Sequence, residues 1–232
     1  MPGGFTSSSN PRSYALGMNR FRSLIARTGA AVLAALVVSA SALAPVPVAA
    51  QSESDLARAV SALRAIGSMQ AGFVQTDRDG RRVTGMMTLK RPGRIRFQYA
   101  PGVPILIVSD GAALTFVDYQ TRQVQRWPIK NSPLGALLDP SRDVMKYGRV
   151  LGSGDPGWVI VEVRDRSHPE YGVITLRFLR KASAPGGLEL AGWIALDSQN
   201  RQTAMTLTNQ RYGVAVDDNM FRYNDPRNPA RR

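Results

Sequence analysis

The sequence predicts a mainly β protein built on one strongly curved antiparallel sheet of about ten or eleven strands. Between Gly85 and Gly111, three short strands are joined by tight Pro/Gly turns, and apolar residues fall at every second position. This period of two places each apolar set on one face of a sheet. Further short strands recur along the chain, with only two or three helical segments between them. So many strands with so few helices favour a single curved sheet, whose concave apolar face must be covered.

The beginning of the chain has the pattern of a secretory signal peptide. The first fifty residues contain four arginines and no acidic residue, residues 28–44 are small and apolar, and residues 48–50 suit a cleavage site. We therefore predict a signal peptide over residues 1–50, with Met18 as an alternative start, and a mature protein in the periplasm. A membrane anchor is the other interpretation, but Pro45 and the weakly apolar core argue against it.

Composition limits what the exported protein can be. The chain has no cysteine, which excludes disulfides, thiolate metal sites, cysteine nucleophiles and lipid modification of this chain. It should therefore be soluble. The formal charge of +13 falls by the four arginines of residues 1–50 to +9. The arginines are spread widely, and we expect no nucleic-acid role. Residues 51–224 suit one domain, and the Pro/Arg-rich residues 225–232 read as a loose tail.

The first half of the mature chain reads as a helix followed by a meander of strands. Residues 55–66 predict an amphipathic helix that is capped by Ser54 and ended by Gly67. A strand opens at residues 72–76, and Asp79-Gly80 is a hairpin turn signal. Further strands are predicted at 83–91, 94–99, 105–109, 113–118 and 123–128.

The meander is interrupted after residue 130. Asn131, Pro133 and three leucines predict a short apolar helix, and residues 143–147 are a candidate for a second one. Strands resume at 158–165, 171–179, 188–197 and 203–212, with a terminal piece around 221–223. The amino-terminal helix and the leucine-bearing helix are the candidates for covering the concave face.

The residues give little sign of catalysis. His168 is the only histidine and lies in a polar turn, and neither a Gly-x-Ser-x-Gly elbow nor a phosphate-binding loop is present. The acidic residues Asp77, Asp79 and Asp197 suit solvated turns better than catalytic pairs. We therefore expect no metal, no cofactor and no enzymatic activity, which favours a binding protein. A secreted hydrolase on a β scaffold is the disfavoured alternative.

Arg91 is the first residue to suspect of function. It ends a strand two positions after Leu89, on the apolar face, where a guanidinium needs hydrogen-bond partners. A plain strand-end arginine that bonds to turn carbonyls is the other interpretation.

With these residues described, the chain resembles the LolA family of periplasmic outer-membrane lipoprotein carriers. The resemblance is strongest over Lys90-Arg91-Pro92-Gly93-Arg94-Ile95-Arg96-Phe97-Gln98-Tyr99 and Val108-Ser109-Asp110-Gly111. It is supported by Phe73-Val74-Gln75, Ser132-Pro133-Leu134 and Phe221.

The resemblance implies an incomplete, half β-barrel with a helical lid over an apolar cavity. It also implies a monomeric carrier that shields the acyl chains of lipoproteins between the inner and outer membranes. An inner-membrane ABC-type lipoprotein-releasing complex would be the donor, and an outer-membrane protein the acceptor. A periplasmic lipid or glycolipid sensor or carrier on the same fold is the alternative.

The resemblance also implies roles for particular residues. Arg91 would hold the lid closed, and Ile95, which stands where a phenylalanine is common, would line the cavity. The alternating pattern extends the predicted cavity set to Met87, Leu89, Ile95, Phe97, Tyr99, Ile105, Ile107, Leu114 and Phe116. Leu134, Leu137 and Leu138 would form the lid. In any β domain the same positions would also face inward as ordinary core.

Overall fold

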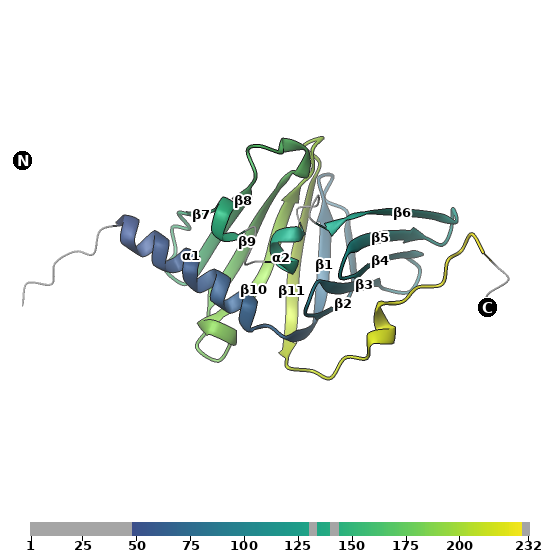
Figure 1. Ribbon diagram of the computed structural model, residues 1–232, viewed down its shortest axis with the longest axis horizontal. Helices are drawn as coiled ribbons and strands as arrows, with labels where there is room; N and C mark the ends of the chain where they lie inside the picture. Colours follow the sequence, from purple (N-terminus) through teal and green to yellow (C-terminus); the bar gives the residue numbers. More distant parts are fainter. Residues whose placement is uncertain (1–47, 130–133, 140–143, 229–232) are drawn as a thin grey trace, which may run out of the picture. The chain divides into compact units, whose positions relative to one another are not determined.

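The computed structural model describes residues 48–129, 134–139 and 144–228, which all belong to one compact unit. They form an open, eleven-stranded antiparallel sheet with few helices (Figure 1), which confirms the predicted fold class. The strands are β1 (Ser68–Asp77), β2 (Arg82–Lys90), β3 (Arg94–Tyr99), β4 (Ile105–Asp110), β5 (Ala113–Asp118), β6 (Gln123–Pro128), β7 (Gly148–Leu151), β8 (Trp158–Arg164), β9 (Val173–Arg180), β10 (Leu188–Leu196) and β11 (Gln202–Tyr212).

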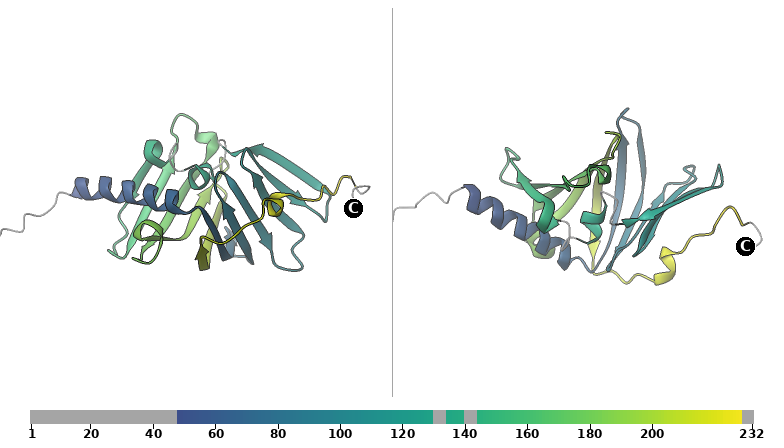
Figure 2. Two further views of the ribbon diagram at one scale, coloured as in Figure 1. Left: turned by 60° about the horizontal axis from the view of Figure 1, so that its bottom comes forward. Right: turned by 45° about the horizontal axis from the view of Figure 1, so that its top comes forward.

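The strand order is β6-β5-β4-β3-β2-β1-β11-β10-β9-β8-β7. The chain thus runs outward from β1 to one edge, crosses to the opposite edge, and returns to place β11 beside β1. The crossing carries the short helices α2 (Gly135–Leu138) and α3 (Val144–Tyr147). Figures 1 and 2 show α2 lying inside the curve of the sheet.

The helix α1 (Val48–Ala65) covers the other part of the concave face, over β7, β8 and β10. Its buried side chains, which include Ala59, Val60 and Leu63, join the main core with the inward residues of the strands. The helix begins before the predicted start at residue 55, so Ser54 lies inside it and does not cap it. The residues from Val48 to Ser54 include neither glycine nor proline, so they do not interrupt the helical backbone.

The outer face of the sheet has a smaller core that the sequence analysis missed. The predicted terminal strand at 221–223 is wrong, because Asp218–Phe221 forms a 3-10 helix, η4. Phe221 packs against Leu106, Val108 and Val117 on the face of β4 and β5 opposite the main core. Lys90 Nζ donates to the carbonyl of Val216 over 2.8 Å, which ties this segment to the sheet.

Several predictions concern residues at or beyond the edges of what the structure describes. The predicted signal peptide lies outside the described residues except for Val48, Ala49 and Ala50, which belong to α1. The predicted cap of the leucine-bearing helix, residues 131–133, also lies outside them. Of the predicted loose tail, residues 225–228 are described, and Arg227 pairs there with Asp225. No helix among the described residues has the length and apolarity needed to cross a membrane.

Candidate functional site

The turn that carries Arg91 is held against a second turn of the sheet. Gly93, between β2 and β3, has φ +68°, and a Cβ there would come within 2.9 Å of Gly111. Ser109 Oγ donates to the Gly93 carbonyl over 2.7 Å and accepts from the Gly111 N–H. The two sequence segments that carry the family resemblance therefore contact each other, and together they fix the position of the Arg91 backbone.

The Arg91 side chain joins α1 to α2. Its Nη2 donates to the carbonyl of Leu63 in α1 over 2.9 Å and to that of Leu137 in α2 over 3.0 Å. Its Nη1 donates to the carbonyl of Leu138, and its Nε donates to that of Ile66 over 3.3 Å. One guanidinium thus donates to backbone carbonyls near the carboxyl ends of two helices.

The environment of Arg91 is partly desolvated. Burial lowers the pKa of the Arg91 guanidinium, and the Asp139 carboxylate just after α2 raises it in part. An arginine still stays charged at neutral pH. Its four hydrogen bonds to carbonyls are therefore charge-assisted, and they form where the guanidinium is partly shielded from water.

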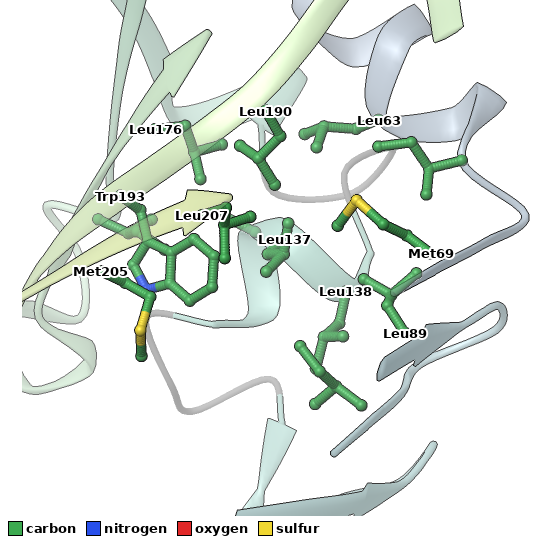
Figure 3. Packing of buried hydrophobic residues seen from close by; sticks show 14 of the residues in the cluster. Leu63, Met69, Leu89, Leu137, Leu138, Leu176, Leu190, Trp193, Met205 and Leu207 are labelled. Atoms are coloured by element: carbon green, nitrogen blue, oxygen red, sulfur yellow. The ribbon is translucent and has the colours of Figure 1, made fainter. Parts of the chain in front are cut away.

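The predicted lid helix, α2, packs its leucines into the concave face (Figure 3). Leu137 and Leu138 are almost completely buried, and Figure 3 places them among Leu89, Met69 and Leu207 from the sheet. Leu134, just before α2, is only half-buried and reaches the cavity described below. The three predicted lid leucines are thus together, but two of them belong to the core.

Three of the predicted cavity residues are not among those that line the cavity described below. Met87, Leu89 and Ile95 are at most 1% exposed and form part of the main core. They lie on β2 and β3, at the end of the concave face that leads to Arg91. The alternating pattern assigned their face correctly, and there they belong to the same core as Leu63 of α1 and Leu137 of α2.

The other predicted cavity residues line an open cavity of about 750 Å³. They are Phe97, Tyr99, Ile105, Ile107, Leu114 and Phe116. The sequence analysis missed the wall formed by Val83, Val103, Trp127, Trp193 and Met205. Trp193 and Met205 come from β10 and β11, and β11 lies beside β1 although the two strands are far apart in the sequence. No local sequence signal marks them as cavity residues.

A group of aromatic rings separates the cavity from the packed end. Phe73 contacts Phe97 and Tyr99 edge-on, with ring centroids 5.6 and 5.2 Å apart, and Phe97 contacts Trp193 at 6.1 Å. The Tyr99 hydroxyl donates to Gln75 Oε1 over 2.6 Å. Burial raises the pKa of Tyr99 to about 12, so the cavity wall is neutral here at physiological pH.

Polar side chains surround the mouth of the cavity. We call this set the polar rim: Asp77, Arg81, Glu170, Tyr171, Asp197, Ser198 and Arg201. Asp77 and Asp197 do form the turns that the sequence predicts, because each Oδ1 accepts two backbone N–H groups. Desolvation raises the pKa of each carboxyl, but these hydrogen bonds and the paired arginine outweigh it and lower both pKa values overall.

His168 takes part in a local contact and has no metal partners. Its Nδ1 lies 3.0 Å from Asp165 Oδ2, and its ring stacks on Tyr171 with centroids 4.8 Å apart. Among the described residues, no group of three His, Cys, Asp or Glu side chains could hold a metal ion. What the site offers is an apolar cavity, a polar mouth and a helix that is held in place by one arginine.

Comparison with known proteins places this arrangement in a family context. A family model described as outer membrane lipoprotein carrier protein LolA matches residues 64–224, which covers all of the strands and the site. An outer-membrane lipoprotein carrier protein from Alkalilimnicola ehrlichii is 29% identical over 205 residues, covering 84% of this chain and 90% of its own. One from Xanthomonas campestris is 26% identical over 179 residues, covering 69% and 79%.

Other similar proteins are more distant or match only in part. An uncharacterized protein from Rickettsia prowazekii is 28% identical over 96 residues, and this chain spans 45% of its length. Among solved structures, a LolA superfamily protein from Nitrosomonas europaea has a TM-score of 0.45 and 13% identity, covering 74% of this chain and 97% of its own. The Pseudomonas aeruginosa MucA/MucB complex has a TM-score of 0.43 and 18% identity, covering 75% and 61%.

Proposed function

We propose, since this chain belongs to the LolA family of outer-membrane lipoprotein carrier proteins, that it is a periplasmic carrier of lipoproteins. It shields their acyl chains in the cavity while they move from the inner to the outer membrane. The observation that carries this proposal is the apolar cavity of about 750 Å³ beside a lid helix that Arg91 holds to α1. We propose no catalytic role for it.

The energetics of acyl chains explain why a carrier is needed. Each CH₂ that leaves an apolar environment for water costs about 0.8 kcal/mol. A chain of ordinary length therefore cannot cross the periplasm exposed to water. Phe116, Trp127 and Ile107 offer it an apolar wall, and a cavity of this size is within the usual range for ligand sites.

The closed lid supports release as well as binding. The packed leucines of α2 and the four carbonyl contacts of Arg91 stabilise the protein without cargo. Cargo that needs more room must displace these contacts, and the apparent affinity falls by the free energy of opening. A carrier with such a lid can give up its cargo to an acceptor that binds the acyl chains more tightly.

The donor and acceptor follow from the same proposal. We propose an inner-membrane ABC-type complex that releases lipoproteins as the donor, and an outer-membrane acceptor that takes them from the carrier. The proposed carrier acts as a monomer.

Material bound to the protein in the cell tests this function. The protein is purified from the periplasm without detergent, and its lipid-soluble and peptide contents are identified by mass spectrometry. We expect acylated polypeptides. Glycolipids alone would favour the sensor or glycolipid-carrier alternative, and the absence of any acylated molecule would contradict the proposal.

A further inference from the structure

The concave face changes from apolar to charged along the strands. In β1, the inward positions are Phe73, Gln75 and then Asp77; in β10 they are Trp193 and Ala195, and Asp197 follows directly after the strand. The polar end of both strands is the polar rim. A ligand whose apolar part fills the cavity therefore places its polar part among charged side chains.

Two of the segments that form the rim are hairpins with the same internal design. In the β1–β2 hairpin, Arg81 Nε donates to Asp77 Oδ2 over 2.8 Å, and in the β10–β11 hairpin Arg201 Nε donates to Asp197 Oδ2 over 2.8 Å. In both, arginine follows aspartate by four residues. The hairpins are neighbours, because β1 pairs with β11 and Asp77 lies opposite Thr203.

This design leaves the outer edge of each guanidinium available. The side chains of Arg81 and Arg201 are 79% and 64% exposed, and each is fixed to its own hairpin through Nε. Arg81 Nη2 also lies 3.6 Å from Asp79 Oδ2. Within the described part of the chain, the Nη groups of Arg201 have no protein partner. A guanidinium held in this way can still bind a carboxylate through its remaining N–H groups.

We propose that Arg81 and Arg201 bind acidic side chains in the polypeptide that directly follows the acylated end of the cargo. This inference rests on the proposed function, since an acylated polypeptide leaving the cavity must cross the rim. The carboxylates of Asp77 and Asp197 are already satisfied by their own hairpins. Glu170 is the remaining rim carboxylate and should oppose acidic cargo.

The test uses two fluorescent peptides that share an acylated amino-terminal cysteine and differ only in having two glutamates or two glutamines after it. The full mature protein should bind the glutamate peptide about fivefold more tightly, because exposed ion pairs contribute modestly. The double variant Arg81→Gln/Arg201→Gln should lose this preference and bind the two peptides with equal affinity. Glu170→Gln should increase the preference, and added salt should reduce it.

A control removes the same charge elsewhere. Arg78 and Arg211 do not line the cavity, so Arg78→Gln/Arg211→Gln should keep the preference. Equal binding of both peptides by the unaltered protein, or equal loss in both double variants, would overturn the inference while leaving the carrier function intact. The inference would also be overturned if the protein preferred anionic phosphatidylglycerol to phosphatidylcholine but did not distinguish the two peptides. Failure to bind either peptide would contradict the carrier function itself, and the rim assignment with it.

Discussion

The two ends of the concave face differ in what covers them. At the end next to Arg91, Met87, Leu89 and Ile95 are buried in the main core, which also includes Leu137 and Leu138 of α2. At the end next to the hairpins, Ile105 and Ile107 stay half-exposed and line the cavity. Both ends come from the same alternating strands. Whether an inward residue is core or cavity wall thus depends on where the helices lie.

The functional meaning of this difference is a division of tasks. In the proposed function, the packed end stabilises the protein without cargo, and the hollow end gives cargo a place to enter. Arg91 belongs to the packed end, yet through α2 it bears on the cavity, because Leu134 before that helix lines the cavity wall. Cargo that enlarges the cavity would therefore act on the contacts of Arg91.

A charge placed at each end should separate the two regions most clearly. Ile95→Glu buries a carboxylate in the packed end and should reduce the free energy of unfolding by about 3–5 kcal/mol. Ile107→Glu keeps its charge near the open cavity and should cost only about 1 kcal/mol, while it blocks acyl-chain binding. Urea unfolding and lipid binding measure the two effects. Ile95→Val, at about 1 kcal/mol, controls for the loss of volume alone. Equal destabilisation by Ile95→Glu and Ile107→Glu would contradict the distinction between a packed end and an open end.

Removing the guanidinium of Arg91 should affect release more than loading. Arg91→Leu loses all four carbonyl contacts, and losing even 1.4 kcal/mol of lid closure would strengthen cargo binding about tenfold. Transfer of a labelled lipoprotein from the loaded carrier to an acceptor should slow accordingly. Arg91→Lys should retain part of the normal transfer rate, since lysine keeps the charge without the forked donor geometry.

The matched control for this change is Arg94→Leu. Arg94 lies three residues away and pairs with Asp218, away from the lid. Its replacement should leave transfer unchanged. Unimpaired release from the Arg91→Leu protein would reduce Arg91 to a residue that stabilises a turn.

The pH dependence of the free energy of unfolding should report how far water is excluded from Tyr99, which lies between the two ends. Burial raises the pKa of Tyr99 from 10.0 to about 12. Above pH 10 the unfolded chain loses this proton while the folded protein keeps it, so stability falls as pH rises towards 12. Tyr99→Phe should make this fall smaller by about 2 kcal/mol, measured as urea unfolding at pH 10 and 12. An unchanged fall would mean that water reaches the phenol freely.

Much of the fold follows from the sequence because it depends on local signals. The alternation between Gly85 and Gly111 fixes which side chains face inward, and the turn residues fix where strands end. Arg91 stands out because a cation on an apolar face needs partners. Its actual partners, Leu63 and Leu137, are remote in sequence, and no local pattern names them.

The errors have a common physical cause, which is long-range packing. Ile95 and Ile107 carry the same pattern, and only the position of α2 makes the first core and the second cavity wall. Phe221 is an apolar residue after a series of strands, which led to the prediction of one more strand. It instead packs on the outer face of the sheet as part of a 3-10 helix. The rim aspartates were correctly predicted as turn residues, but the shared spacing from Asp77 to Arg81 and from Asp197 to Arg201 was a signal that went unused.

The chain contains three tryptophans, and they allow a direct test of where acyl chains bind. Trp127 and Trp193 line the cavity. Trp158 lies on the opposite face of β8 from the core residues Val159 and Val161 and stacks under Arg177. Two proteins are needed, one that keeps only Trp193 and one that keeps only Trp158, with phenylalanine elsewhere. Each is titrated with a lipoprotein or acylated peptide whose acyl chains carry bromine, which quenches tryptophan fluorescence on contact. The cavity assignment predicts strong quenching of Trp193 and none of Trp158; quenching of Trp158 without quenching of Trp193 would contradict it.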